Sequence, residues 1–388
     1  MQPAKQILPI IILSQFCCTS LWFAGNAVVA ELIRDFGLLN NALGYLTSSV
    51  QLGFITGTLL FAIYSITDRF SPSKVFFTCA ILGAVFNLAI IWEGHHFYSL
   101  LILRFLTGFC LAGIYPVGMK IAADYFDKGL GKSLGFLVGA LVLGTALPHL
   151  LKFLSIGYSW QAVFITTSLF AMIGGLLILL MVPDGPYRKR GVSTDLLACF
   201  KVFKIKPFQQ AAIGYFGHMW ELYAFWAFVP VILSIYLGLH QKVHFDISLL
   251  SFLIIAIGSF ACALGGVFSE RFGVKATAST FLFASFFCCL CSPLILIYAP
   301  PEVFILFLLV WGMVVIADSP LFSTLVAQNA EPKVKGAALT IVNSIGFAIT
   351  IVSIQLLSYA QKLMPDQYIF LILALGPAVG LIFLKKRI

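Results

Sequence analysis

The feature that most constrains this chain is a succession of long apolar stretches separated by short polar loops. A helix that crosses a bilayer needs about 20 mostly apolar residues. Twelve stretches meet that length, at about 7–33, 42–65, 75–92, 99–123, 132–154, 161–182, 208–237, 247–268, 276–298, 302–327, 336–360 and 366–384. With 61% hydrophobic and 10% charged residues, the chain is too apolar for a water-facing fold. The sequence therefore predicts an all-α membrane protein with twelve transmembrane helices.

The longest hydrophilic stretch, residues 183–206, divides the twelve apolar stretches six and six. We therefore expect an N-terminal six-helix bundle over 1–182, a cytoplasmic linker over 183–206 and a C-terminal six-helix bundle over 207–388. Residues 193–206 mix Leu, Phe and Val with Lys. This pattern is typical of a short amphipathic helix on the inner leaflet, and an ordinary solvated linker is the alternative.

Basic residues are unequally distributed between the two sides that this topology defines. Eighteen lie on the side that holds both termini, and four lie on the other, namely Arg34, Lys152, Lys242 and Lys362. Because cytoplasmic loops collect Lys and Arg, we expect a multi-pass protein of the cell inner (plasma) membrane with both termini in the cytoplasm. The net charge of +9 then reflects topology, so we expect lipid as a partner and no nucleic acid.

The first apolar stretch has a second interpretation. Lys5, an apolar run and the small residues of 27–30 also resemble a cleaved signal peptide. Polar Gln15 and Asn26 interrupt that run, and the topology needs a helix here. We therefore favour a first transmembrane helix.

The sequence carries no convincing catalytic, metal or cofactor motif. The nine cysteines have no zinc-type spacing. Residues 129–133 hint at a phosphate loop, but Phe126 stands where its first Gly is required. His240 with His244 in a loop, or His218 with Glu221, could hold a metal ion, although such pairs more often have no metal. We expect no enzyme, no cofactor and no metal.

The two halves of the chain repeat. Asp68-Arg-Phe-Ser follows the second stretch, and Glu270-Arg-Phe-Gly follows the eighth, 202 residues later. The fourth and tenth stretches also correspond, with Tyr115-Pro116 in one and Ser319-Pro320 in the other. Two six-helix halves that repeat in parallel are a transporter architecture, with the solute path at the seam.

With these motifs the chain resembles the major facilitator superfamily of secondary transporters over essentially its whole length. The family's loop after its second helix runs Gly-x-x-x-Asp-Arg-x-Gly-Arg-Lys. Residues 64–74 keep Asp68, Arg69 and Lys74, and residues 266–275 keep Glu270 and Arg271. Arg104-Phe-Leu-Thr-Gly108 is similar to the family's Arg-x-x-x-Gly signature. The Gly-Pro motif of the family's antiporters is only partly matched, since His149 stands where that motif has Pro.

The resemblance implies that the loop motif gates transport. An ionised Asp68 at a helix boundary can pair with Arg69 and with the positive end of a neighbouring helix. Such a contact exists in one arrangement of the halves and breaks in the other. The alternative is that these loop charges only set topology.

Four ionisable residues within the apolar stretches are candidates for proton coupling or substrate binding, since such residues are costly in a membrane. They are Arg104, His218, Glu221 and Asp318. His218 and Glu221 share a helix face, and Glu221 lies near mid-helix, where burial opposes ionisation and a cation such as Arg104 favours it. The alternative is a structural pair of Glu221 with His218 or Arg104. Asp318 precedes a proline and either acts in coupling or satisfies the disrupted backbone. Arg104 either holds an anionic solute or pairs with an acid.

The resemblance also implies that helices 1, 4, 7 and 10 line a central cavity. The candidate lining residues are Gln15, Trp22, Asn26, Tyr115, Trp220 and Asn343. Trp22 and Trp220, with Tyr223 and Trp226, either form an aromatic wall around a solute or serve as packing and interface anchors.

These features predict a secondary active transporter that works by alternating access. We expect it to move a small solute, with a preference for an organic anion or zwitterion because of Arg104 and His218, and to couple transport to protons. Multidrug or amphiphile efflux by proton antiport and an uncoupled facilitator are the alternatives. A transporter-like sensor is disfavoured, because no segment outside the spans exceeds about 25 residues. The resemblance implies a monomer.

Overall fold

The computed structural model describes residues 4–39, 41–126, 130–155, 159–188, 202–331 and 335–385. These residues form helices and loops, and no strand occurs among them. The chain divides into two compact units, Met1–Thr194 and Asp195–Ile388. Most of the predicted linker and amphipathic helix, over 189–201, lies outside the described residues.

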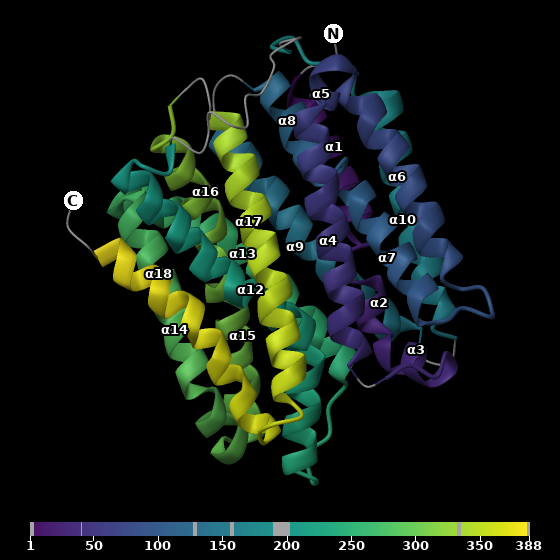
Figure 1. Ribbon diagram of the computed structural model, residues 1–388, viewed down its shortest axis with the longest axis vertical. Coiled ribbons are helices and arrows are strands. Elements are labelled where there is room, and N and C mark those ends of the chain that lie inside the picture. Colours follow the sequence, from purple (N-terminus) through teal and green to yellow (C-terminus); the bar gives the residue numbers. More distant parts are fainter. Residues whose placement is uncertain are drawn as a thin grey trace. The chain divides into compact units, whose positions relative to one another are not determined.

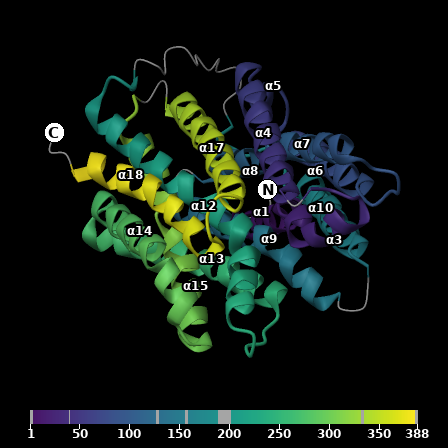
Figure 2. The ribbon, with the colours of Figure 1, turned by 60° about the horizontal axis from the view of Figure 1, so that its bottom comes forward.

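The described residues of the first unit form ten helical segments, most of which are labelled in Figure 1. They are α1 (Ala4–Thr19), α2 (Ala24–Ala27), α3 (Val29–Asp35), α4 (Ala42–Ile63), α5 (Ile66–Arg69), α6 (Pro72–Ala89), α7 (Phe97–Leu111), α8 (Tyr115–Tyr125), α9 (Leu130–Leu154) and α10 (Gln161–Met181). Helices α6, α7 and α10 lie side by side in both ribbon views (Figures 1 and 2). Helix α1 packs against α9 and α10.

The second unit contains α12 (Lys206–Leu239), α13 (Ile247–Phe272), α14 (Val274–Tyr298), α15 (Pro301–Ala317), α16 (Ser319–Gln328), α17 (Lys335–Ala360), the 3-10 helix η1 (Asp366–Ala374) and α18 (Leu375–Lys385). Helix α12 contacts both α17 and α18. Several helices start where the sequence requires. Proline occupies the first turn of α12, α15 and α16, where its missing N–H costs nothing, and the Asp246 carboxylate caps α13 at the Leu249 N–H.

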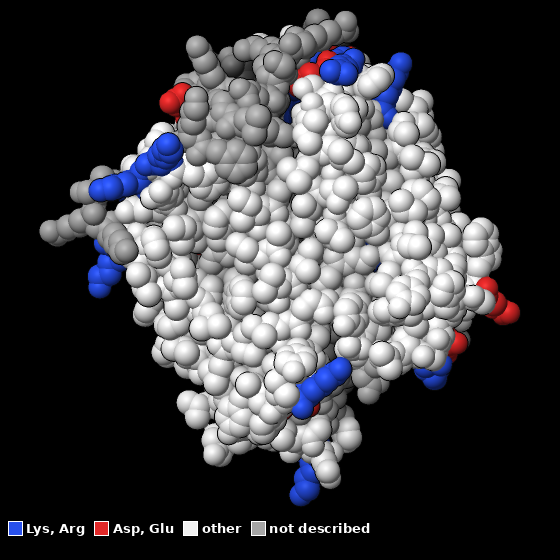
Figure 3. Space-filling view, viewed as in Figure 1, with Lys and Arg blue, Asp and Glu red and all other residues white. Residues whose placement is uncertain are grey.

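Eleven helices are long and apolar enough to span a membrane, and the shorter Gln6–Thr19 helix precedes them among the described residues. This agrees with the predicted all-α, twelve-helix membrane fold. On the face shown in Figure 3, the visible charged side chains gather near helix ends, and the surface over the helix middles is almost entirely uncharged.

The prediction of one continuous helix over 7–33 is wrong, because the helix is broken between Thr19 and Ala24. The Thr19 and Ser20 hydroxyls donate to the carbonyls of Gln15 and Cys17, which competes with regular helix formation. The Leu21 and Trp22 N–H groups bond three residues back, to Cys18 and Thr19. The predicted fourth and tenth spans are likewise divided, into α7 and α8 and into α15 and α16, next to Pro116 and Pro320.

Close helix crossings repeat between the units. A Cβ atom on Gly108 of α7 would lie 2.0 Å from the Val50 carbonyl oxygen of α4. A Cβ atom on Gly312 of α15 would lie 2.0 Å from the Ile254 carbonyl oxygen of α13. Both members of the second crossing are 204 residues beyond those of the first. Small residues let membrane helices approach this closely, so the sequence repeat is also a packing repeat.

Alanine at either crossing glycine should therefore destabilise the protein. We expect Gly108→Ala and Gly312→Ala each to cost about 1–3 kcal/mol, because the backbone must move to admit the methyl group. The measurement is thermal unfolding in detergent. Gly135→Ala and Gly336→Ala are the matched helical controls, since a Cβ there meets nothing within 4 Å. Equal melting temperatures for all four variants would contradict this packing account.

Candidate functional site

The second unit holds a buried carboxyl group at the centre of a three-helix contact. Glu221 of α12 is 1% exposed. Its Oε1 atom accepts hydrogen bonds from Ser285 Oγ of α14 at 2.5 Å, from Trp311 Nε1 of α15 at 2.6 Å and from Cys289 Sγ of α14 at 3.3 Å. Burial opposes the ionised carboxylate, and these three donors favour it. All three donors bond to Oε1, so a proton can bind to Oε2 without breaking any of these hydrogen bonds.

One turn earlier on α12, His218 pairs with Asp318. The His218 Nδ1 atom lies 2.8 Å from Asp318 Oδ1, and both side chains are 1% exposed. Asp318 stands between α15 and α16, directly before Ser319-Pro320. The His218 Nε2 atom is buried and has no hydrogen-bond partner among the described residues. The ring lies near those of Tyr215 and Phe322, with centroids 6.0 and 6.2 Å away.

This arrangement differs from the alternative in which Glu221 forms a structural pair with His218 or Arg104. His218 and Glu221 lie on one face of α12, but each turns to a different partner on another helix. Glu221 is held by α14 and α15, and His218 by the break that precedes α16. The expected structural pair of Glu221 with His218 or Arg104 does not occur among the ion pairs of the described residues.

In the first unit, Arg104 of α7 satisfies the break in the first span. It is 1% exposed. Its Nη1 and Nη2 atoms donate to the Leu21 carbonyl at 3.2 Å, Nη2 donates to the Trp22 carbonyl at 2.5 Å, and Nη1 donates to Asn87 Oδ1 of α6 at 3.2 Å. Arg104 makes no ion pair within the described ranges. Its terminal nitrogens are thus committed to backbone and amide oxygens, rather than to an acid as the sequence allowed.

The networks of Arg104 and Glu221 join corresponding spans of the repeat, although the two residues themselves lie on different spans. Arg104 joins α7 to α6 and to the first span, and Glu221 joins α12 to α14 and α15. Asn87 and Cys289, which take part in these two networks, are 202 residues apart, the same offset as the loop motifs. Each unit therefore ties its first, third and fourth spans together through one buried charge, and the sign of that charge is reversed.

The predicted cavity residues have individual partners within their own units. Asn26 of α2 donates to Thr47 Oγ1 of α4 at 2.8 Å, and the Trp22 ring lies 4.8 Å from that of Phe54. Trp220 donates to the Ile372 carbonyl of η1 at 3.0 Å, and that carbonyl also accepts the Leu375 backbone N–H.

The remaining cavity candidates are Gln15, Tyr115 and Asn343. Gln15 of α1 is fully buried, and neither polar atom of its amide has a hydrogen-bond partner within the described chain. Tyr115 opens α8, and Asn343 lies on α17; both are half-buried. Their roles in lining a solute path stay predictions.

The loop motif has a different ion pair from the one expected. Asp68 of α5 pairs with Lys120 of α8 at 2.8 Å, while Arg69 is exposed. Lys74 is exposed at the start of α6. In the second copy, Glu270 and Arg271 are both exposed, and the Arg271 guanidinium lies 5.3 Å from the centre of the Phe272 ring. The gating role stays a prediction.

Sequence reasoning missed four residues that complete these networks: Asn87, Ser285, Cys289 and Trp311. The sequence contained a pattern that could have indicated three of these four residues. Ser285 and Cys289 are four residues apart in an apolar helix and so share one face. Trp311 directly precedes Gly312, the counterpart of Gly108. Neither pattern indicates which acid the donors meet.

A family model described as Major Facilitator Superfamily matches residues 11–354. Among curated relatives, an efflux pump FUBT of Fusarium oxysporum is 28% identical over 46% of this chain and 31% of its own length. The 4-hydroxybenzoate transporter PcaK of Pseudomonas aeruginosa is 23% identical over 40% of this chain and 35% of its own length. The aligned chain thus spans about a third of the length of these relatives.

Solved structures resemble the whole chain. A point mutant of the nucleoside transporter NupG aligns over 99% of this chain and 100% of its own, with a TM-score of 0.73 and 18% identity. A bacterial homologue of the human lysosomal transporter Spinster, in an inward-facing and unoccupied conformation, aligns over 99% of this chain and 95% of its own, with a TM-score of 0.69 and 16% identity. At these identities the likeness establishes the fold.

Removing Arg104 should destabilise the protein even when no solute is present. Arg104→Met leaves the Leu21 and Trp22 carbonyls and the Asn87 amide oxygen without their donor. At about 1–3 kcal/mol for each buried group left unpaired, we expect a clear fall in the melting temperature in detergent. Arg104→Lys should restore it only in part, because an ammonium is a compact point charge without the guanidinium fork.

The control for this variant is Arg34→Met, since the Arg34 side chain is 73% exposed and a surface ion pair contributes about 0–1 kcal/mol. An Arg104→Met protein that melts like wild type would contradict the structural role. That result would instead favour the alternative that Arg104 binds an anionic solute.

Proposed function

Since this chain belongs to the major facilitator superfamily of transporters, and is a transporter rather than an enzyme, we propose that it is a proton-coupled secondary transporter whose proton carrier is Glu221. The observation that carries the proposal is the convergence of three donors on one oxygen of a buried carboxyl group. The donors stabilise the carboxylate when the proton leaves. The other oxygen accepts the proton when it returns.

His218 connects this proton site to the solute. Its Nδ1 is held by Asp318, so in the imidazolium form its Nε2–H is a buried donor with no partner among the described side chains. Such a donor suits the carboxylate of a small organic anion or zwitterion. A buried charge pair costs free energy unless it is well bonded, and a solute carboxylate at Nε2 supplies the missing bond. The relative named as a 4-hydroxybenzoate transporter supports this solute class.

Coupling follows from the position of both groups on α12. Glu221 and His218 are one turn apart, and their partners lie on α14, on α15 and at the break before α16. A change in protonation at Glu221 keeps the Trp311 bond to α15 but changes its strength, because a bond to a carboxylate is stronger than one to a neutral carboxyl group. Solute binding at His218 alters the contact at the end of the same helix. An alternating-access cycle needs such a shared two-state element.

The proposal also covers the domain organisation, the membrane location, the orientation and the oligomeric state of the protein. The proposed protein has a six-helix bundle over 1–182, a cytoplasmic linker over 183–206 and a second six-helix bundle over 207–388. It is a monomer in the inner or plasma membrane, and both of its termini are cytoplasmic. The excess of basic residues on the side of the termini supports the orientation.

A second candidate is efflux of amphiphilic compounds by proton antiport, because several matched relatives are named efflux pumps. In that cycle the acids are counter-charges for a cationic solute. Inhibition of transport by small carboxylates supports the first proposal, and inhibition by lipophilic cations alone supports the second.

Neutral isosteres of the buried acids should abolish coupling while leaving passive exchange. We expect Glu221→Gln and Asp318→Asn to lose accumulation of labelled 4-hydroxybenzoate driven by an imposed pH gradient in proteoliposomes. Counterflow exchange needs no net proton movement, so it should persist in Glu221→Gln. Uphill uptake and exchange are the two measurements.

The matched control is Glu302→Gln, because Glu302 is an exposed acid at the start of α15 and should transport like wild type. If both buried-acid variants still accumulate solute against its gradient, proton coupling through these groups is wrong. If the wild type itself only equilibrates solute that it transports, the protein is an uncoupled facilitator.

A further inference from the structure

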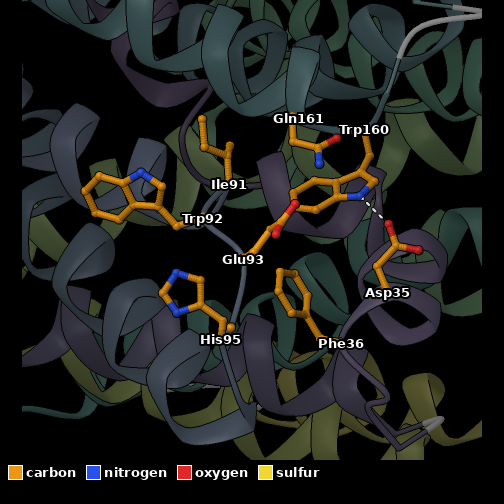
Figure 4. A pocket seen from close by; sticks show the side chains of 9 residues that line it. Asp35, Phe36, Ile91, Trp92, Glu93, His95, Trp160 and Gln161 are labelled. Carbon is orange, nitrogen blue, oxygen red and sulfur yellow. Dashed lines mark hydrogen bonds between the residues drawn. The ribbon is translucent and has the colours of Figure 1, made fainter.

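A second polar site lies in the first unit, far in sequence from Glu221. A cavity of about 420 Å³ opens where α3 ends, between the α6–α7 loop and the start of α10 (Figure 4). In Figure 1 this region is at the opposite end of the unit from the N-terminus. Its principal walls are Asp35, Phe36, Trp92, Glu93, His95 and Trp160. The volume falls within the range of small-molecule sites, about 300–1,000 Å³.

One wall of the cavity is aromatic and held in place. Trp160 is 9% exposed, and its Nε1 donates to Asp35 Oδ2 at 2.7 Å. Phe36 stands edge-on to Trp160 and to His95, with ring centroids 5.8 and 6.0 Å apart. Trp160 and Phe164 belong to a buried apolar cluster with residues of α2, α3 and α4, so the wall rests on the core of the unit.

The His95 ring completes this wall without spare hydrogen-bonding capacity. Its Nε2 lies 2.8 Å from the Ala89 carbonyl oxygen, so that nitrogen carries a proton. Its Nδ1 lies 3.1 Å from the Ser99 hydroxyl oxygen. The ring is therefore a flat surface rather than a free donor for an anion.

The opposite side of the cavity is exposed. Trp92 is 69% exposed, and Glu93 is exposed as well. Gly94 follows with a φ of +87°, a left-handed conformation that favours glycine. In Figure 4 the Glu93 side chain points inward, toward Trp160 and Gln161. The Glu93 carboxylate thus faces the fixed wall, and the Trp92 ring lines the exposed side of the cavity.

The two carboxylates of the cavity, Asp35 and Glu93, differ in whether they already have a partner. Asp35 is already compensated, since Arg34 Nε lies 2.8 Å from its Oδ1. The Arg34 guanidinium, and next the Trp160 indole, hold the pKa of Asp35 below its ordinary value. Glu93 has no hydrogen bond or ion pair within the described chain. The cavity therefore presents one unpaired negative charge among aromatic faces.

We propose that this cavity binds a small organic ammonium cation, such as a quaternary amine. Aromatic faces attract ammonium groups, most strongly those of Trp, and such cages are used for quaternary ammonium recognition. Glu93 supplies the counter-charge. A small anion would meet Glu93 and Asp35, and a hard metal ion would find too few oxygen ligands, since Mg²⁺ and Ca²⁺ take about six or more. The site is independent of the proton site, because it shares no residue with it.

The test is equilibrium binding of labelled choline to the full-length, detergent-solubilised protein. We expect saturable binding that is displaced by tetramethylammonium but not by 3,3-dimethylbutan-1-ol, the uncharged isostere of choline. Glu93→Gln should weaken binding about tenfold, as loss of a close counter-charge predicts. Trp92→Leu should weaken it by about 3- to 30-fold, the range that cation–π contacts span.

Two controls locate the site. Glu302→Gln removes an exposed acid elsewhere, and Glu221→Gln removes the proposed proton carrier; both should bind choline like wild type. Absence of saturable binding up to about 10 mM, equal displacement by the uncharged isostere, or loss of binding in Glu221→Gln rather than Glu93→Gln would each overturn the proposal. Since Glu93 and Trp92 are exposed, their variants should fold, and an unchanged melting temperature verifies it.

Discussion

The structure depends on one constraint: inside a bilayer every backbone N–H and C=O group needs a partner within the protein. Regular helices meet this need by themselves, but this chain interrupts its helices. At the first break Arg104 donates to the Leu21 and Trp22 carbonyls. Arg104, which the sequence suggested as a solute contact, is therefore a residue that makes a broken helix tolerable.

The same constraint distinguishes Arg104 from the proposed proton carrier, Glu221. The terminal nitrogens of Arg104 bond to oxygens that never change protonation, so its network has one stable form. The network of Glu221 joins the corresponding three spans of the second unit, but its donors meet a group that can exist with or without a proton. A network of three donors around a titratable group has two satisfied forms, and a coupled transporter needs a two-state element of this kind.

The sequence predicted what depends on local pattern and missed what depends on long-range contact. The spans follow from apolar length, and the divisions at Pro116 and Pro320 coincide with prolines that the repeat had already singled out. The break after Thr19 contains no proline, and Arg104, which satisfies it, lies 83 residues away. Helical spacing suggested a His218–Glu221 pair, whereas His218 meets Asp318 one hundred residues later. Such partners are set by tertiary packing, which periodicity does not encode.

The most direct test of the account is the protonation of Glu221 itself, observed by pH-difference infrared spectroscopy of the purified protein in lipid. The account predicts a protonated-carboxyl band that titrates reversibly in wild type, persists in Asp318→Asn and is absent in Glu221→Gln. A spectrum in which Glu221→Gln removes no titrating band would show that this carboxyl group does not exchange a proton, and would contradict the proposed coupling.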